Sequence, residues 1–265
     1  MIFPALMARK FQATESRDLE AASERLPETE AFIQRCVARV RPFMELPAGA
    51  SVLDLGAAQG ASAIAYHRAG FISHGVEPFE PAITVSRELI GRAGIELEIR
   101  HGFGEALPYA DSSFDLVHAY SVMEHVDDPW QVFREVYRTL RPGGGFLFST
   151  TSSLGLRQNE IGRFPLFAWY PPRAQRAIME WAARERPALV GYTDRPAVHW
   201  FKHRQVQLAL AAIGYRKIVD RWEMRSQSGE LTGTRKLVIG MAARNSVVRL
   251  AADVLLGGLE YLAIK

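Results

Sequence analysis

The chain has 265 residues, a formal net charge of +3, and 48% hydrophobic and 23% charged residues. These proportions are ordinary for a soluble globular protein, and they exclude a largely disordered chain or a low-complexity fibre. A single cysteine, Cys36, excludes an intramolecular disulfide and a thiolate-rich zinc or iron–sulfur site. The first residues lack the basic start and long apolar core of a signal peptide, and no apolar run reaches the roughly 18 residues of a membrane span. We therefore expect a cytoplasmic protein.

Charge is unevenly distributed along the chain. Residues 1–159 carry 15 basic and 20 acidic side chains, a net charge of −5, whereas residues 160–265 carry 17 and 9, a net charge of +8. The basic half indicates either a solvated surface or an anionic partner, such as a phosphate, a nucleic acid or a membrane surface. Its arginines are scattered rather than clustered, which favours the solvated surface.

The spacing of apolar residues predicts an N-terminal helical segment over residues 1–46, with a helix over 28–46. Strands and helices then alternate. Strands are predicted over residues 51–55, 72–77, 95–100, 114–119 and 146–149, and helices over 59–69, 78–93 and 129–141. This alternation predicts an α/β fold with a Rossmann-like, doubly wound, mostly parallel sheet and helices on both faces. Such sheets bind ligands beyond the carboxyl ends of their strands.

The alternation is interrupted over residues 151–199, which are rich in aromatic residues and proline. We expect an insertion there that partly covers the ligand site. A helix over 202–213, a strand over 215–224, a mostly helical segment over 235–256 and a last strand over 259–264 would complete a seven-stranded sheet. The predicted organisation is therefore an N-terminal helical segment followed by one α/β domain over 47–265.

The first predicted strand runs into a turn of small residues, Asp54-Leu-Gly56-Ala-Ala58-Gln-Gly60. Small side chains let a ligand lie against bare backbone. The dinucleotide fingerprint would need glycine at 58 and 61, where this chain has alanine, so a nicotinamide enzyme is disfavoured. Asp54 would repel a pyrophosphate but suits a ligand that carries a cation.

Glu77 ends the second predicted strand, and Pro78 follows it. A carboxylate at this position, after such a turn, can accept hydrogen bonds from both hydroxyls of a ribose. We therefore expect Glu77 to bind the ribose of a nucleoside cofactor.

Taken together, the motifs resemble those of class I S-adenosylmethionine-dependent methyltransferases, in the branch that includes quinone-biosynthesis and other small-molecule enzymes. The resemblance covers roughly residues 50–150. Its matching stretches are residues 54–60, Glu77, residues 104–117, and residues 124–126 with 140–144.

The resemblance implies S-adenosylmethionine as the cofactor and assigns its parts along the chain. The backbone around Gly56, Ala58 and Gly60 would hold the methionine part, with Asp54 beneath the turn and Glu77 on the ribose. The remaining assignments are Phe103, Gly104 and Glu105 beside the adenine, and Tyr120 and Ser121 on the sulfonium side. Two positions depart from the family pattern. Ala58 stands where the family has glycine, and Phe103 stands where the family often has aspartate.

The cofactor would supply an activated methyl group, so the protein mainly has to hold an acceptor in line with it. For a hydroxyl acceptor, His125 is a candidate general base, and otherwise a locally bonded histidine at a helix start. His199 is a second candidate, with a structural role as its alternative. His199 and His203 are four residues apart, as metal ligands on a helix can be, but no matching carboxylate or cysteine accompanies them, and we expect no metal.

The aromatic insertion has two interpretations, a small core of its own or an apolar acceptor pocket with arginines for an anionic group. The predicted function is methyl transfer to a small-molecule or lipid-like acceptor, with oxygen preferred over nitrogen or carbon. Methylation of RNA and a non-catalytic, cofactor-binding scaffold are the alternatives; nucleic acid is disfavoured by the lack of a basic tail. The apolar segment 247–256 could pack on the insertion or a partner chain, or contact a membrane surface.

Overall fold

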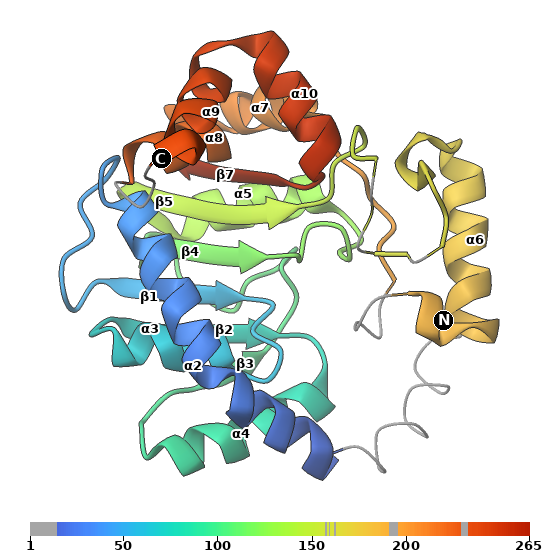
Figure 1. The fold of residues 1–265 in the computed structure, drawn as a ribbon. Coiled ribbons are helices and arrows are strands. Elements are labelled where there is room, and N and C mark those ends of the chain that lie inside the picture. Colours follow the sequence, from blue (N-terminus) through green and yellow to red (C-terminus); the bar gives the residue numbers. More distant parts are fainter. Residues whose placement is uncertain (1–14, 157, 159, 162, 191–195, 229–232) are drawn as a thin grey trace.

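The computed structural model describes residues 15–156, 158, 160–161, 163–190, 196–228 and 233–265. Seven strands form one sheet in the order β3-β2-β1-β4-β5-β7-β6 (Figure 1). The strands are β1 Ser51–Leu55, β2 Ile72–Glu77, β3 Ile99–His101, β4 Phe114–Tyr120, β5 Leu140–Thr150, β6 Lys217–Asp220 and β7 Leu259–Ile264. β1 to β5 pair in parallel, and β7 is antiparallel to both β5 and β6. The expected mostly parallel, seven-stranded sheet is confirmed.

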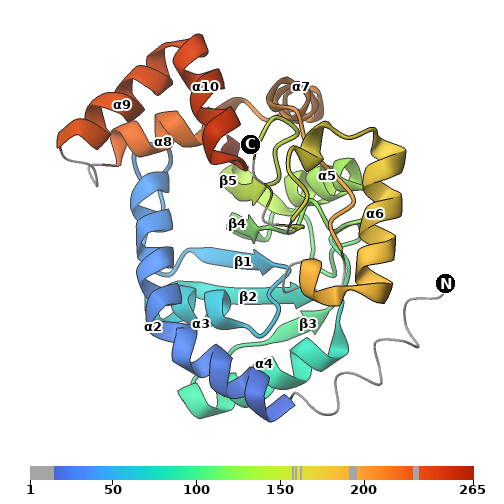
Figure 2. The same cartoon turned by 45° about the vertical axis from the view of Figure 1, so that its right-hand side comes forward.

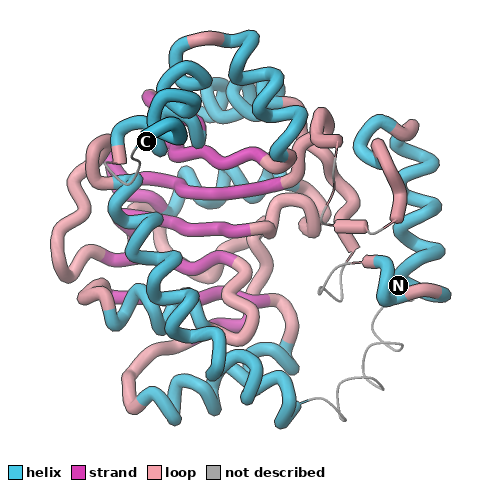
Figure 3. Tube along the Cα trace, viewed as in Figure 1, coloured by secondary structure: helices cyan, strands magenta, loops and turns pink. Residues whose placement is uncertain are grey.

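Helices cover both faces of this sheet, as Figure 3 shows. The helices before the insertion are α2 Glu15–Val40, α3 Ala61–Arg68, α4 Glu80–Ala93 and α5 Pro129–Thr139. Those after it are α7 His203–Ile213, α8 Arg221–Gln227, α9 Gly233–Arg244 and α10 Ser246–Leu256. Neighbouring residues of one strand serve opposite faces: Val52 packs with residues of α2 and α3, whereas Leu53 packs with residues of α5 and α7. Burial on both faces explains why β1 is apolar along most of its length.

The N-terminal helix is longer than its prediction and ends earlier. α2 extends over Glu15–Val40 rather than 28–46, and Leu19, Leu26 and Val40 are among its buried residues. It ends next to Pro42, whose ring disfavours a helical conformation at the preceding residue. Residues 1–14 of the predicted N-terminal segment lie outside the described residues.

Three strand predictions need correction. β3 is confined to Ile99–His101, and the alternating Ile95 and Leu97 instead pack as coil against the core. β5 begins already at Leu140, with an irregular register opposite β4 that accommodates the following glycines. β6 ends at Asp220, because the carboxylate of Asp220 accepts hydrogen bonds from the N–H groups of Trp222 and Glu223 and starts α8.

The insertion after β5 contains the short helices η1 Phe167–Trp169 and η2 Pro187–Leu189 and the longer α6 Pro172–Glu185. These form a small hydrophobic cluster in which Phe167 and Met179 are buried. In Figures 1 and 2, α6 stands beyond the arrowheads of the parallel strands. The insertion therefore lies at the carboxyl end of the sheet, where the sequence predicts the ligand site. Within the described residues, no helix combines the length and apolarity needed to cross a bilayer.

Candidate functional site

The turn after β1 is built so that its backbone faces outward. Gly56 and Gly60 have φ angles of +75° and +81°, in the left-handed region that favours glycine. The N–H groups of Gly56 and Ala57 both donate to the carbonyl of Val76, which fixes the turn to the end of β2. A Cβ at Gly56 would lie 2.6 Å from Cγ2 of Val122, so the loop after β4 closes directly over this glycine.

Ala58 continues the turn with a φ of +46°, although it carries a side chain. Residues held in this region store backbone strain, typically about 1–3 kcal/mol, and tend to occur at ligand sites. The strain is supported by a hydrogen bond of 2.9 Å from the Ala58 N–H to Oε2 of Glu77. The alanine that replaces the family glycine therefore still adopts a glycine-like conformation.

Glu77 connects the ends of the first two strands. Its side chain is buried, and its other oxygen, Oε1, accepts a hydrogen bond of 3.1 Å from the Phe79 N–H. Burial raises the pKa of Glu77, and the two backbone N–H groups partly offset this effect. Carboxylate oxygens have two acceptor positions each, so Glu77 retains acceptor capacity for a ligand beside the turn.

Asp54 lies beneath the same turn and is buried. Its Oδ1 is 3.6 Å from Nδ1 of His118 on β4, and its Oδ2 has no hydrogen-bond partner among the described residues. A buried carboxylate oxygen without a partner costs free energy, so this atom is suited to a cationic or donor group of a ligand.

A pocket of about 550 Å³ opens beside the turn. Its walls come from α2, from the turn and from the end of β4. Lining residues include Phe32, Asp54, Gly56, Ala58, Gln59 and Tyr120. A larger groove of about 920 Å³ lies among α8, α9 and α10 and contains none of the predicted site residues, so we place the ligand site at the smaller pocket.

Three other predicted cofactor residues, Phe103, Gly104 and Glu105, are not among the residues that line this pocket. Phe103 is exposed, and its ring makes a T-shaped contact with the ring of His101. The carbonyl of Pro78 lies 3.1 Å from Nε2 of His101. Gly104 is buried where a Cβ would lie 3.1 Å from Val132. The Glu105 carboxylate accepts hydrogen bonds from the backbone N–H groups of residues 127 and 128. It therefore stabilises the loop before α5.

Tyr120 ends β4 and lines the pocket, and Ser121 follows it. Both are exposed, and the ring of Tyr120 packs edge-on against Phe32 of α2 at 4.8 Å. Ser121 has a φ of +56°, and its N–H donates to the carbonyl of Ser149 on β5. Left-handed backbone thus occurs both in the turn after β1 and in the loop after β4, which contact each other at Gly56 and Val122.

The two candidate bases differ in environment. His125 lies in a turn before Asp128, the cap of α5, and not at the helix start itself. His199 precedes α7, so it does not share a helix with His203 as its spacing suggested. Nε2 of His199 is 3.0 Å from the carbonyl of Val126, and His203 Nδ1 is 2.7 Å from the Tyr261 hydroxyl. His199 and His203 each form a hydrogen bond within the protein. This favours the structural role for His199.

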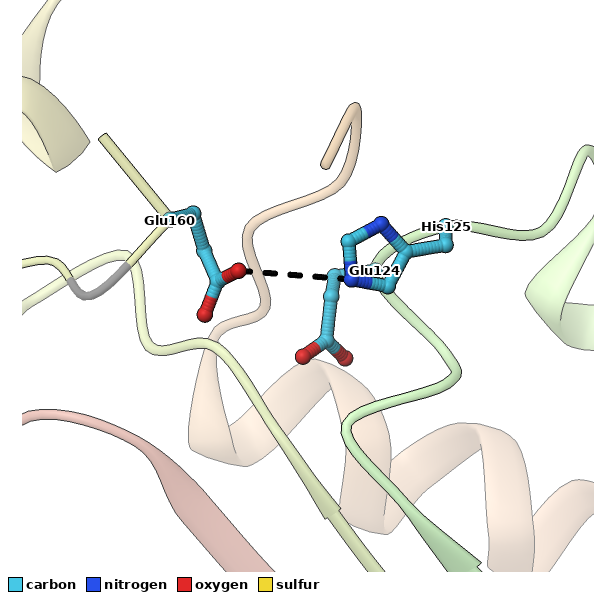
Figure 4. A group of neighbouring side chains, drawn as sticks. All are labelled: Glu124, His125 and Glu160. Carbon is cyan, nitrogen blue, oxygen red and sulfur yellow. Dashed lines mark ion pairs between the residues drawn. The ribbon is translucent and has the colours of Figure 1, made fainter. Parts of the chain in front are cut away.

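His125 is instead part of a three-residue cluster with Glu124 and Glu160, shown in Figure 4. One ligand atom from each residue lies within 4.8 Å of the other two. Nε2 of His125 is 4.0 Å from Oε2 of Glu160, which belongs to the insertion. No residue outside this group completes a metal-ligand set in the described part of the chain, and the cluster alone does not establish a metal site.

Glu124 is the most buried member of this cluster. Burial raises the pKa of Glu124 to about 7, against the lowering effect of hydrogen bonds that include one of 2.8 Å from the Thr150 hydroxyl. Its backbone carbonyl accepts from the N–H groups of Val198 and His199. The loop after β4 therefore holds both the cluster and the end of the insertion.

Comparison with known proteins agrees with this geometry. Residues 53–148 match the family model of the methyltransferase domain. An uncharacterized methyltransferase of Mycobacterium sp. strain KMS is 39% identical over 111 residues, which cover 41% of this chain and 42% of the relative. The chain thus matches about two fifths of the length of such curated relatives. Residues 53–148 therefore carry a methyltransferase domain.

Solved structures share the fold of this methyltransferase domain. Phosphoethanolamine N-methyltransferase 2 of Haemonchus contortus, in complex with S-adenosylmethionine, has a TM-score of 0.56 at 16% identity, covering 88% of this chain and 52% of that one. The YcgJ protein of Bacillus subtilis has a TM-score of 0.52 at 17% identity, covering 90% and 98%. At these identities the likeness shows the fold alone.

The residues at the turn fit S-adenosylmethionine. Gly56 and Ala58 present little side chain to the pocket, the Oδ2 atom of Asp54 is buried without a partner among the described residues, and Glu77 offers free acceptor positions. These features suit the amino acid part, with its ammonium group, and the ribose hydroxyls, respectively. They do not suit a pyrophosphate, which two buried carboxylates would repel.

Three residues of the site were missed by the sequence analysis. His118 follows from the strand register, since Asp54 pairs with it across β1 and β4, but no motif marks it. Glu124 was noted only as part of the Glu-His-Val stretch, and its burial was not predictable from spacing. Glu160 carries no sequence signal, because it comes from the irregular insertion.

Proposed function

We propose that the protein transfers the methyl group of S-adenosylmethionine to a hydroxyl of a small or lipid-like acceptor. The observation that supports this most directly is the left-handed Ala58, whose N–H bonds to Glu77 above the buried Asp54. Ala58 and Asp54 line the pocket, and Glu77 lies behind the turn, bonded to its backbone. In this proposal the turn holds the methionine part, Glu77 the ribose, and Phe103 the adenine.

The acceptor would enter between the turn and the insertion. Residues 151–153 and 198–201 pair with each other through a bridge between Ser152 and Phe201, and both ends adjoin the loop after β4. The insertion is thereby anchored beside Ser121 and His125. We propose that it acts as a cover that excludes water from the acceptor, with its exposed aromatic residues providing apolar contacts.

His125 is the base that we propose for a hydroxyl acceptor. When bound, S-adenosylmethionine supplies an activated methyl group, and little further chemistry is required of the protein. Nε2 of His125 takes the hydroxyl proton as the acceptor oxygen is methylated, and Glu160, 4.0 Å away, stabilises the resulting imidazolium. The insertion would thus contribute a charged group to the reaction.

Thermal unfolding tests the cofactor assignment first. A ligand at 100 times its dissociation constant stabilises a protein by about 2.7 kcal/mol, which should raise the midpoint by about 5–10 °C at this chain length. S-adenosylmethionine and S-adenosylhomocysteine should produce this rise, and NAD should not. A rise with NAD alone would contradict the assignment.

Methyl transfer from labelled S-adenosylmethionine to a panel of phenols, quinols, amines and lipids then tests the reaction. His125→Gln should lower kcat by about 10²–10⁴-fold while the affinity for S-adenosylmethionine is unchanged. Glu160→Gln should have a smaller effect, and the double variant should be no slower than His125→Gln, because the two residues act as a unit. Full activity of His125→Gln would exclude it as the base.

The basic half of the chain supports a second candidate, methylation of RNA. Binding to transfer RNA distinguishes methylation of RNA from methylation of a small acceptor. If the protein contacts RNA phosphates, its affinity for transfer RNA should fall steeply as the salt concentration rises. Tight cofactor binding without transfer to any acceptor would instead support the scaffold, as Ala58 and Phe103 suggest. We favour the small acceptor, and a cytoplasmic location, on the grounds given above.

A further inference from the structure

The paired helices α9 and α10 expose an unusual number of large apolar side chains. We call these residues the α9–α10 apolar surface. They are 43–73% exposed and comprise Leu237, Val238, Met241, Val247, Leu250 and Leu255. Single exposed apolar residues are normal on a protein, but six of them on two helices that contact each other indicate an interaction surface.

The outward face of α10 is apolar along its whole length. Val247, Leu250, Ala251 and Leu255 are exposed and recur at helical spacing. α10 contains only two charged residues, and both turn inward: Arg249 pairs with Asp220 at 2.8 Å, and Asp253 pairs with Arg221 at 2.8 Å. Of the described side chains of α10, none places a charge on this face.

The charge within α9 and α10 is mainly basic, although Glu223 of α8 lines the adjoining groove. The sequence of α9 and α10 carries four basic residues, Arg235, Lys236, Arg244 and Arg249, and one acidic residue, Asp253. Asp253 is buried, whereas Arg244 is exposed at the junction of the two helices. Apolar side chains flanked by basic residues match the boundary between anionic lipid headgroups and acyl chains.

A second copy of this chain would fit the surface less well. In a two-fold dimer the same patch meets itself, so the exposed Arg244 of each copy would enter the same interface. Neither α9 nor α10 offers an exposed acidic side chain among the described residues to compensate. An anionic lipid supplies the missing negative charge.

We propose that the α9–α10 apolar surface docks the protein on an anionic lipid membrane. α10 is also hydrogen-bonded to the insertion, because the Leu156 N–H donates to the Val254 carbonyl at 2.9 Å. Docking would therefore hold the start of the insertion near the lipid. The inference rests on this surface alone and does not depend on the proposed methyl transfer.

Vesicle co-sedimentation of the full-length chain tests the proposal. The protein should bind vesicles that mix phosphatidylglycerol with phosphatidylcholine, and should bind pure phosphatidylcholine at least about tenfold more weakly. Val247→Ser/Leu250→Ser should reduce binding to the mixed vesicles by about tenfold, since it removes apolar contacts without adding charge. Arg244→Ala should also reduce binding to the mixed vesicles, and the reduction should be larger at low salt than at high salt.

Leu208→Ser is the matched control, because Leu208 is 60% exposed on α7 and outside the surface. It should bind vesicles like the unmodified protein. Unfolding midpoints for all variants show whether each is folded. Equal loss of binding in the Leu208 variant, or no binding of the folded protein to anionic vesicles, overturns the proposal. So does a concentration-dependent dimer that the Val247/Leu250 variant abolishes, because the surface is then covered by a second copy.

Discussion

Oδ1 of Asp54 lies 3.6 Å from Nδ1 of His118, its register partner on the adjacent strand β4. Both side chains are buried beneath the turn that follows β1, and neither ring nitrogen of His118 has a hydrogen bond within the described part of the chain. Polar groups buried with so few partners lower stability, and they are most easily explained as part of a ligand site.

Asp54→Asn tests this explanation. The variant keeps the shape of the side chain but removes a buried charge, so the free energy of unfolding without ligand should stay the same or increase by about 1 kcal/mol. Affinity for S-adenosylmethionine should fall about tenfold or more, because one charge-assisted contact contributes roughly 1.5–3 kcal/mol. Urea unfolding and calorimetric titration measure the two quantities. Lower stability with unchanged affinity would make Asp54 a structural residue only.

Glu77→Gln should weaken S-adenosylmethionine binding by about 10–100-fold, since it replaces charge-assisted hydrogen bonds to the ribose with neutral ones. The amide oxygen can still accept one of the two backbone N–H groups, those of Ala58 and Phe79, that bond to the carboxylate. Some loss of stability is therefore expected as well. Calorimetric titration at constant temperature gives the dissociation constant.

Glu96→Gln is the control for this substitution. Glu96 is exposed in the loop before β3, at the amino end of the sheet, and should not influence the cofactor. If Glu77→Gln binds S-adenosylmethionine as tightly as the control does, the ribose assignment is wrong.

Because Gly56 lies close to Val122, an alanine at Gly56 should lower the stability of the protein more than an alanine at Gly49. Gly49→Ala and Gly56→Ala both place a side chain at positive φ, +78° and +75°, but a Cβ at Gly49 meets no atom within 4 Å. Gly49→Ala should therefore cost about 1 kcal/mol of stability. Gly56→Ala should cost a further 1–3 kcal/mol, roughly, because its Cβ would lie 2.6 Å from Cγ2 of Val122.

The double variant Gly56→Ala/Val122→Ala separates crowding from backbone strain. Removal of the Val122 methyl groups should recover most of the additional cost, measured as the difference in urea unfolding free energy. Equal stability of Gly49→Ala and Gly56→Ala would show that the loop after β4 moves away freely, and that the closed turn is not a fixed feature of the site.

Much of the sheet was predictable from the sequence because its signals are local. β1, β2 and β7 agree with their predictions, and α7 ends at Gly214 as expected, since strand apolarity and left-handed glycines are properties of short segments. The strands that were mispredicted depend on partners. Ile95 and Leu97 alternate like a strand, yet pairing with β2 begins only at Ile99.

The candidate site divides in the same way. The residues around the turn follow motifs in consecutive positions, so Gly56, Glu77 and their neighbours were identified together. His118 and Glu160 reach the site through strand register and through the insertion, which no short-range pattern encodes. The spacing of His199 and His203 would also suit one helix, but α7 begins only at His203, so the two residues lie in different elements.

Glu124 gives the site a pH-dependent stability. Its pKa of about 7 in the folded protein lies above its usual value of 4.5, mainly because the side chain is buried. A carboxyl whose pKa is raised by folding leaves stability intact at low pH, and that stability is lost as the pH rises through the folded-state pKa. From pH 5 to pH 8, Glu124 alone should therefore lower the free energy of unfolding by about 2–3 kcal/mol.

Glu124→Gln removes the titration, while its amide oxygen can still accept a hydrogen bond from the Thr150 hydroxyl. The free energy of unfolding of the variant should therefore depend less on pH, and relative to the unmodified protein it should be higher at pH 8 than at pH 5. Urea unfolding of both proteins at the two pH values measures the difference. The same slope in both proteins would mean that Glu124 ionises normally in the folded state, with its charge held by a partner in the cluster with His125 and Glu160.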